Sequence, residues 1–427
     1  MTPIATMPTG AAALFWGVVT FSILILLHEG GHFLAARAFG VKVHEFMLGL
    51  PGPSLSWRSP RTDVRYGVTM VPLGGYVRIA GMEPGAEDPL LGRALGIVVD
   101  RERTDVAELA DALGLERDRA SALLATIEDY GAGESAAKTQ ALAPLVAREP
   151  GETDDVLLAR VRSTVYRGQR PWKRVVILAM GVLANLVAAI LILVLTLTLW
   201  GVPTPTPVLE EVAAGAPAAV AGMRPGDRIV SLDGIAVSDW AQVTTAMRAA
   251  KEGQTVAVGI HRAGALLTLH PILTARPGGG GMLGVTASLV DVPMPAGEAI
   301  GASFSMVGQV FVAVGQMLNP KTFAVSVQGA RSIVGISYEV ANAAAQGPLS
   351  YAWMIAVLSL SLGVMNILPI PPLDGGKIAS EFVEIVLRRP LPRKLSLAFS
   401  ATGAVLLFSL VFYLMYADIV RYIVNSG

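Results

Sequence analysis

The 427-residue sequence contains no cysteine and only five histidines, and 15% of its residues are charged. Without thiols, disulfides and thiolate zinc sites are excluded, so any zinc ion has to take nitrogen and oxygen ligands. Basic and acidic residues number 33 each, and this balance gives no electrostatic reason to expect a nucleic-acid partner. No lysine or arginine precedes Arg37, which argues against a cleaved signal peptide because such peptides begin with a basic segment. We therefore expect the first apolar segment to be retained.

Composition indicates a membrane protein. Hydrophobic residues make up 53% of the sequence, and the mean hydropathy is +0.56. Four apolar runs are long enough to cross about 30 Å of hydrocarbon, and they lie at about 11–33, 175–200, 351–368 and 397–416. The short connection 377–394 is basic, so we place it in the cytoplasm together with the first connection. The predicted fold is a polytopic α-helical membrane protein with four transmembrane helices and the lipid bilayer as its surroundings.

The first apolar run ends in the segment HEGGH, whose imidazoles are His28 and His32 and whose acid is Glu29. On a helix, positions i and i+4 share one face, so both imidazoles can bind one cation while Glu29 reaches a water on it. Short motifs of this kind recur by chance, and lone histidines are usually core or surface groups. Ionisable groups at bilayer depth are costly without a partner, however. The segment therefore favours the metal site of a zinc hydrolase.

Two histidines do not complete such a site, because catalytic zinc takes three protein ligands and one water. A third donor has to come from another span at the same depth. The third span ends in NILPIPPLDGG, residues 366–376, where Asp374 lies in an apolar turn rich in proline and flanked by glycine. Prolines break the helix and leave carbonyl groups that only a cavity or protein packing satisfies. Asp374 is the candidate third ligand, and the alternative is an ordinary loop in which the aspartate caps the next helix.

Residues 66–82 alternate and are rich in valine, tyrosine and glycine, with Gly74 and Gly75 near the middle. This pattern predicts a β-hairpin that turns at the two glycines and lies near the membrane face. Such a hairpin either adds a strand to an extended substrate or packs against the first span, and both alternatives stay open. Residues 83–163 are charged and rich in alanine, so we expect a soluble helical insertion there.

Residues 204–287 have the composition of a small β-rich domain, which the charge pattern places outside the cytoplasm. The segment PAAVAGMRPGDRIVSLDG, residues 217–234, resembles a PDZ domain, a module that binds extended peptides or chain ends. We therefore expect one extracytoplasmic PDZ-like α+β domain, and the alternative is a spacer between spans. Beyond it, residues 293–345 are expected to form amphipathic helix at the outer face rather than another span.

HEGGH in the first span, NILPIPPLDGG in the third and the PDZ-like insert between the second and third together resemble the bacterial site-2 proteases. These are the regulator of sigma-E protease group of intramembrane zinc metalloproteases. The resemblance implies zinc as cofactor, Asp374 as its third ligand, Glu29 as general base and Asn366 as a polar contact near the substrate or oxyanion. The segment PWKRVVILAMGVLANL resembles the start of the family's second span and implies that Asn185 holds the substrate backbone. Val182 stands there in place of the family's usual proline.

A helical substrate has to unwind before attack, and its free backbone could pair with the hairpin, so Gly74 and Gly75 join the expected substrate contacts. The resemblance implies a single-span membrane protein as substrate, such as an anti-sigma factor, cleaved in regulated intramembrane proteolysis in the bacterial inner membrane. The PDZ-like domain would act as a size filter. Remnant signal peptides are the rival substrate. A non-proteolytic PDZ scaffold or a metal carrier is the alternative of another class, but neither needs Glu29 beside the ligands.

The expected organisation follows the chain in eight parts. These are a first transmembrane helix with HEGGH (1–36), a cytoplasmic-side loop and membrane-associated hairpin (37–82), the soluble helical insertion (83–165), the second transmembrane helix (170–200), the PDZ-like domain (204–290), an amphipathic membrane-proximal region (291–350), the third transmembrane helix with the LDG motif (351–376), and a basic loop with the fourth transmembrane helix (377–427).

Overall fold

The chain forms two compact units, one of Met1–Leu193 with Gly301–Gly427 and the other of Val194–Ile300. The computed structural model describes residues 9–72, 74–82, 87–135, 141–275, 280–319, 321–323, 325–326, 330–389 and 391–419. The helices of the apolar regions are α1 (Gly10–Ala38), α6 (Pro171–Leu199), α9 (Ala296–Leu318), α11 (Ile333–Gln346), α12 (Pro348–Ile367), α13 (Asp374–Leu387) and α14 (Arg393–Ile419).

Five helices in the described part of the chain are long and apolar enough to cross a membrane. Four of them, in α1, α6, α12 and α14, coincide with the runs recognised in the sequence. The fifth, Ala296–Met317 in α9, lies where an amphipathic helix is expected. Its glycine, serine and glutamine residues lower its hydropathy to 1.4, against 2.2 to 2.8 for α1 and α6. The number of helices that cross the bilayer therefore stays a prediction.

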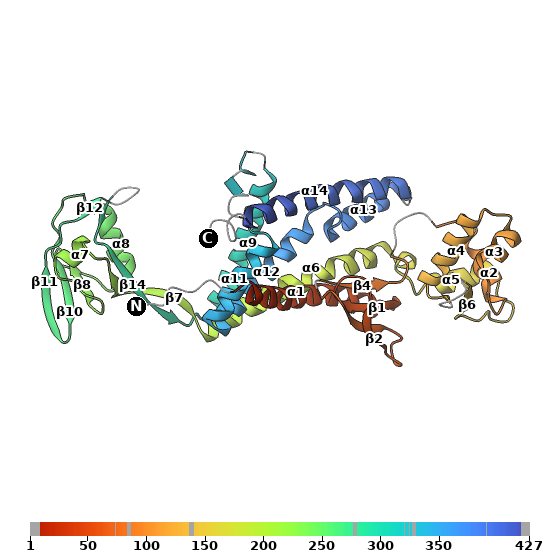
Figure 1. Ribbon diagram of the computed structural model, residues 1–427, viewed down its shortest axis with the longest axis horizontal. Helices are drawn as coiled ribbons and strands as arrows, with labels where there is room; N and C mark the ends of the chain where they lie inside the picture. Colours follow the sequence, from red (N-terminus) through yellow and green to blue (C-terminus); the bar gives the residue numbers. More distant parts are fainter. Residues whose placement is uncertain are drawn as a thin grey trace. The chain divides into compact units, whose positions relative to one another are not determined.

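Small residues allow the membrane helices of the first unit to approach closely. Helices α1, α11 and α12 lie side by side (Figure 1). A Cβ atom on Gly17 of α1 would lie 2.3 Å from the hydroxyl of Ser337 in α11, and one on Gly31 would lie 2.1 Å from the carbonyl oxygen of Met180 in α6. Both distances are far below van der Waals contact. The second glycine of HEGGH is thus a packing position that brings α1 against α6.

The segment 66–82 does not form the expected hairpin. The first unit holds a four-stranded sheet of order β2–β3–β1–β4, made of Val43–Leu48 (β1), Ser54–Arg58 (β2), Arg65–Thr69 (β3) and Gly75–Ile79 (β4). Strand β1 lies between the two predicted strands, with Phe46 opposite Tyr66 in the parallel pair and opposite Val77 in the antiparallel pair. The reason is that β1 carries its own apolar face. Its Val43 is buried with Ile79 in the core at the end of α1, and this core is available only when β1 is in the middle.

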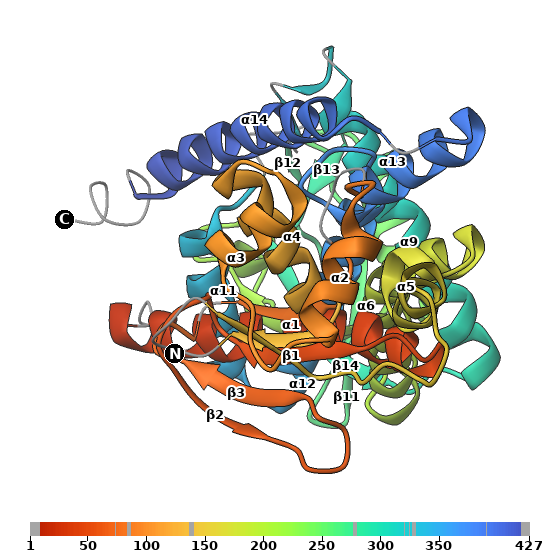
Figure 2. The same cartoon turned by 90° about the vertical axis from the view of Figure 1, so that its right-hand side faces the viewer.

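Residues 87–165 fold around a hydrophobic core of their own. Their elements are α2 (Leu91–Val99), α3 (Val106–Leu113), α4 (Arg117–Asp129), β5 (Gly133–Ser135), β6 (Leu142–Pro144) and α5 (Asp154–Arg162), followed by the 3₁₀ turn η1 (Tyr166–Gly168). Local sequence sets the ends of α3, because Asp105 and Glu108 form a reciprocal capping box and Gly114 closes the helix with φ 64°. Both views show the four helices gathered in one cluster (Figures 1 and 2), with Leu95 and Leu123 in its centre.

The insertion is attached to the sheet at the end of α4. The Asp129 carboxylate accepts a hydrogen bond from the Gly81 N–H at 2.9 Å, directly after β4. The Asp129 carbonyl lies 2.7 Å from Nε2 of His44 in β1, and Lys42 donates to the carbonyl of Gly131 at 2.8 Å. The helical insertion is therefore bonded to both strands of the β1–β4 pair at one end, where β1 begins and β4 finishes.

The second unit is a six-stranded sheet of order β11–β10–β8–β7–β14, with β9 paired to β8. Its elements are β7 (Val202–Val212), α7 (Pro217–Val220), β8 (Arg228–Leu232), β9 (Ile235–Ala236), α8 (Trp240–Ala249), β10 (Val258–Arg262), β11 (Ala265–Leu269), β12 (Thr274–Ala275), β13 (Gly281–Met282) and β14 (Val285–Val292). Arg262 donates twice to the buried Asp227 carboxylate at 2.7 Å. A cavity of about 470 Å³ lies between Trp240 and Met247 of α8 and the strands β13 and β14.

Candidate metal centre

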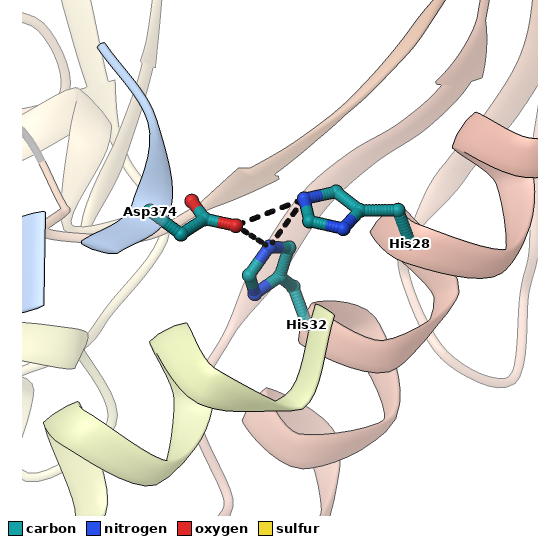
Figure 3. Close-up of side chains that lie close together, drawn as sticks. All are labelled: His28, His32 and Asp374. Atoms are coloured by element: carbon teal, nitrogen blue, oxygen red, sulfur yellow. Dashed lines mark hydrogen bonds and ion pairs between the residues drawn. The ribbon is translucent and has the colours of Figure 1, made fainter. Parts of the chain in front are cut away.

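Three side chains from two distant parts of the chain point at one another in the first unit. Figure 3 shows His28 and His32 projecting from α1 toward Asp374, the first residue of α13. Their nearest donor atoms all lie within 4.8 Å of one another. All three side chains are buried, with at most 9% of each residue exposed. The structure thus brings the HEGGH histidines to the aspartate of the LDGG segment.

The turn before Asp374 owes its shape to two glycines. A Cβ atom on Gly375 would lie 2.2 Å from the carbonyl oxygen of Ile367, and one on Gly376 would lie 2.4 Å from the nitrogen of Pro371. Only glycine permits these backbone contacts, so the pair lets α13 begin directly against the end of α12. The cap of α13 is Leu373, with no side-chain cap hydrogen bond. The aspartate therefore does not cap the helix, and its carboxylate faces the imidazoles.

The spacing of the three donor atoms matches that of ligands around a tetrahedral ion. Nε2 of His28 lies 2.9 Å from Oδ2 of Asp374 and 3.3 Å from Nε2 of His32, and the third side of the triangle is 3.0 Å. Ligands bound about 2.0 to 2.1 Å from a tetrahedral zinc ion lie about 3.3 Å from one another. Two neutral imidazoles and one carboxylate are also a donor set that zinc uses in hydrolases. The residues present therefore fit zinc.

The far nitrogen of each imidazole faces helix α6. Nδ1 of His32 lies 2.8 Å from the carbonyl oxygen of Ile177, and Nδ1 of His28 lies 3.4 Å from the side-chain amide nitrogen of Asn185. Both partners belong to α6. A Cβ atom on Gly181 would lie 2.3 Å from Nε2 of His32, so this glycine leaves the space that the ring occupies. Helix α6 thus forms the layer that fixes the orientation of the ligands.

Glu29 is held by the edge strand of the sheet. Its Oε2 accepts a hydrogen bond from the backbone N–H of Val77 in β4 at 3.0 Å. Gly75, at the start of the same strand, lies close to α1, because a Cβ there would be 3.2 Å from Cγ2 of Ile25. Gly74, with φ 99°, precedes it, and its carbonyl oxygen accepts from the N–H of Gly49. The two glycines therefore bring β4 beside the glutamate instead of forming a hairpin turn.

The two candidate asparagines are both buried. Asn366 is in the last turn of α12 and 8% exposed, whereas Asn185 is completely buried. The side-chain oxygen of Asn185 has no hydrogen-bond partner, and its backbone carbonyl accepts from Ser359 at 2.9 Å. Contact of either asparagine with substrate stays a prediction.

Of the residues around the three donor groups, Asn185, Gly74 and Gly75 are expected from the sequence, whereas Ile177, Val77 and Lys377 are not. Ile177 and Val77 act through backbone atoms, which no side-chain pattern reveals. Lys377, three residues after the aspartate, donates to Oδ1 of Asp374 at 3.2 Å, and a lysine in the first turn after an acidic ligand was a usable signal.

A second cavity, of about 270 Å³, lies next to the aspartate on the side of α13. Lys377 and Glu381 line it together with Tyr166. The Tyr166 hydroxyl donates to Glu381 at 3.0 Å, and Arg174 lies 3.0 Å from the same carboxylate. Burial raises the pKa of Glu381 above its ordinary value even though Arg174 opposes this shift. The cavity therefore has ionisable side chains on its wall, and one of them, Lys377, is hydrogen-bonded to Asp374.

A buried histidine pair and an adjacent glutamate on an apolar helix, with a carboxylate from a distant helix, are the donor set and the acid of a metallohydrolase. More specifically, residues 16–410 match the model of Peptidase family M50, and the chain belongs to this family, the site-2 proteases. The family resemblance seen in the sequence is thereby confirmed. The chain is a zinc metalloprotease of multi-pass membrane type, as the sequence predicts.

Relatives with this activity in their names match almost the whole chain. Metalloprotease MmpA of Caulobacter vibrioides is 28% identical, and the alignment covers 94% of each chain. Zinc metalloprotease RasP of Geobacillus kaustophilus is 23% identical over 95% of this chain and 97% of its own length. Among solved structures, the PDZ domain of the SdrC-like protein from Listeria monocytogenes matches 20% of this chain and 90% of that chain, with 24% identity and a TM-score of 0.18.

Proposed function

We propose that this protease cleaves the transmembrane segment of single-span membrane proteins, with His28, His32 and Asp374 as its zinc ligands and Glu29 as its general base. The observation that carries the assignment is the convergence of the three donor atoms, two from α1 and one from α13, at ligand spacing. A bound zinc ion would supply Lewis acidity, which lowers the pKa of water and polarises a peptide carbonyl.

Glu29 performs the proton transfers. The hydrogen bond from Val77 holds Oε2, which leaves Oε1 to take the proton of the attacking water. The same carboxyl group then gives the proton to the amine that leaves when the peptide bond breaks. General acid–base catalysis of this kind contributes about 10²- to 10⁴-fold to the rate. Lys377, bonded to Oδ1 of Asp374, keeps the ligand carboxylate oriented.

Strand β4 is the proposed binding edge for the unwound substrate. It is the last strand of its sheet, so one side of its backbone is not paired with another strand. A substrate in helical form hides its carbonyls in intrahelical bonds, whereas an extended segment can pair with a strand edge. The position of Gly75 next to Ile25 supports a path for the substrate between β4 and α1. Asn366 would contact the same segment.

The substrate class that we favour is a membrane protein already shortened outside the cytoplasm, with an anti-sigma factor as the leading example. We place the enzyme in a bacterial inner membrane, with four transmembrane helices and the second unit as an extracytoplasmic, PDZ-like size filter. The cavity between α8 and β14 supports a peptide-binding role for that unit. No partner nucleic acid is expected, because the charges balance.

The test compares purified wild-type protein with Glu29→Gln, using single-span reporters in liposomes. We expect the wild type to cleave within the apolar segment, and the variant to lose at least about 100-fold in rate with its zinc content unchanged. Equal cleavage by both, or no cleavage by zinc-loaded wild type, would overturn the proposal. A reporter with a bulky outer domain and a remnant signal peptide, tested in parallel, separate the substrate classes.

A further inference from the structure

The first unit contains a cavity of about 690 Å³ that is separate from the metal centre. Among the residues that the structure describes, its wall carries five arginines, Arg162, Arg167, Arg174, Arg388 and Arg389, and two acidic residues, Glu87 and Glu384. A volume of this size is in the range of small-molecule binding sites. Nothing in the hydrolytic mechanism uses it.

The positive charge of this arginine cavity exceeds what its acidic residues balance. Arg162 pairs with Glu87, and Arg174 lies 3.9 Å from Glu384. Arg388 and Arg389 are exposed, and in the part of the chain that the structure describes neither forms an ion pair. Nε of Arg162 and Nε of Arg174 are both buried without a hydrogen-bond partner. Among the described residues, the guanidinium groups of Arg388 and Arg389 are therefore the exposed groups of the cavity that no carboxylate pairs with.

The cavity lies at the beginning of two apolar helices. Pro171, on its wall, is the first residue of the α6 span, and Arg389 precedes the span that begins at Lys394. Both helices enter the hydrocarbon from this side. Trp172 is 54% exposed at the start of α6, as expected for an aromatic residue at a membrane interface. If α6 and α14 cross the bilayer, the arginines are expected at the level where lipid headgroups end and hydrocarbon begins.

The last turns of α13 add an apolar surface beside the arginines. Phe382 is 64% exposed and Val386 is 69% exposed, although both lie within a few residues of Arg388. A free anion in water would gain nothing from this surface. A phospholipid would place its phosphate among the guanidinium groups and its acyl chains against these side chains.

We propose that the arginine cavity binds the phosphate of an anionic phospholipid. Planar guanidinium groups bind phosphate oxygens in pairs of parallel hydrogen bonds, and basic pockets between transmembrane helices on the cytoplasmic side are suited to anionic headgroups. Arg174, on the wall of the arginine cavity, lies near both Glu384 and Glu381, and Glu381 lines the second cavity beside Asp374. Glu381 lines the same cavity as Lys377, which donates to Asp374.

The test measures lipid binding by the purified full-length protein in detergent. Short-chain phosphatidylglycerol is titrated against short-chain phosphatidylcholine, and the Arg388→Ala/Arg389→Ala variant is compared with an Arg101→Ala/Arg103→Ala variant. The control removes the same charge from two exposed arginines of the insertion. We expect wild type and control to prefer phosphatidylglycerol. The cavity variant should bind it about 10- to 30-fold more weakly, since each interfacial arginine contributes about 1 kcal/mol.

Two further arms keep the test decisive. An Arg388→Lys/Arg389→Lys variant retains the charge and guards against loss of folding; we expect weaker binding than wild type and stronger binding than the alanine variant. Inorganic phosphate and glycerol 3-phosphate test the source of the anion. The proposal is wrong if wild type shows no preference for phosphatidylglycerol, or if both alanine variants lose the same amount of affinity for it. It is also wrong if inorganic phosphate binds as tightly as the lipid.

Discussion

The backbone N–H of Val77 donates a 3.0 Å hydrogen bond to the carboxylate of Glu29. This contact joins the edge strand of a soluble-type sheet to the acid of the HEGGH helix. Val77 is opposite Phe46 in the β1–β4 pair, and antiparallel partners alternate between bonded and non-bonded pairs. Since the Val77 N–H points at Glu29, it does not take part in the ladder with β1.

Val77→Pro removes this donor and leaves the ladder intact, because proline is tolerated where a strand N–H faces away from its neighbour. We expect kcat to fall about 10- to 100-fold, as for loss of an outer-shell partner, with zinc content unchanged. The measurement is reporter cleavage beside metal analysis. Tyr76→Pro is the matched control, since that N–H faces β1 and its loss should destabilise the sheet. Full activity of the Val77 variant would show that Glu29 needs no anchor.

Alanine substitutions at the two glycines of HEGGH should have opposite effects on stability. A Cβ on Gly31 would meet the Met180 carbonyl at 2.1 Å, whereas one on Gly30 has no atom within 4 Å. Gly31→Ala should therefore force α1 away from α6 and destabilise the protein by about 1 to 3 kcal/mol. Gly30→Ala should be neutral or slightly stabilising, because alanine favours helix. Thermal unfolding in detergent distinguishes them, and similar melting temperatures would contradict the packing of α1 on α6.

Removal of the Asp374 carboxylate, the third proposed ligand, should abolish metal retention. Asp374→Ala leaves two imidazoles, and we expect zinc at background level after dialysis. Lys377→Ala, which removes only the hydrogen bond to Oδ1, should weaken zinc about 10- to 100-fold and keep partial occupancy. Zinc content by mass spectrometry is the measurement. Stoichiometric zinc in the aspartate variant would exclude Asp374 as a ligand.

The attachment of the insertion depends on Asp129. Asp129→Ala leaves the Gly81 N–H without its partner, which costs about 1 to 3 kcal/mol for a buried donor. We expect faster proteolytic cleavage between residues 82 and 165 and lower activity, since Gly81 directly follows the strand that holds Glu29. Asp111→Ala, on an exposed position of α3, is the control. Equal protease sensitivity of the two variants would show that the Asp129 hydrogen bond does not hold the insertion against the sheet.

The convergence of His28, His32 and Asp374 was predictable from sequence because each part carries a strong local signal. HEGGH needs only helical periodicity to place two imidazoles on one face. Asp374 stands out because proline and glycine around a buried acid are unusual at the end of a span. Chemistry then demands that they meet, since two histidines alone do not make a catalytic zinc site.

The β-sheet was not predictable in the same way. The β1 sequence VHEFML mixes buried and half-buried positions, so it lacks the clean alternation of a half-buried strand. Without β1, the strands at 65–69 and 75–79 are read as each other's partners. The Val77–Glu29 bond depends on that register. In helix α9 the apolar residues are interrupted by glycine, serine and glutamine, so composition alone does not distinguish an amphipathic helix from a span there.

His32 and Asp374 are 342 positions apart in the chain. Because of this separation, a zinc ion at the site would also act as a cross-link. An ion held by both would close a loop of most of the molecule, and closing a long loop lowers the entropy of the unfolded chain. In a protein with no cysteine, zinc is then the equivalent of a single long-range disulfide. A chelator would therefore do more than stop hydrolysis. It would also remove a cross-link between the first and last thirds of the sequence and lower the stability of the fold.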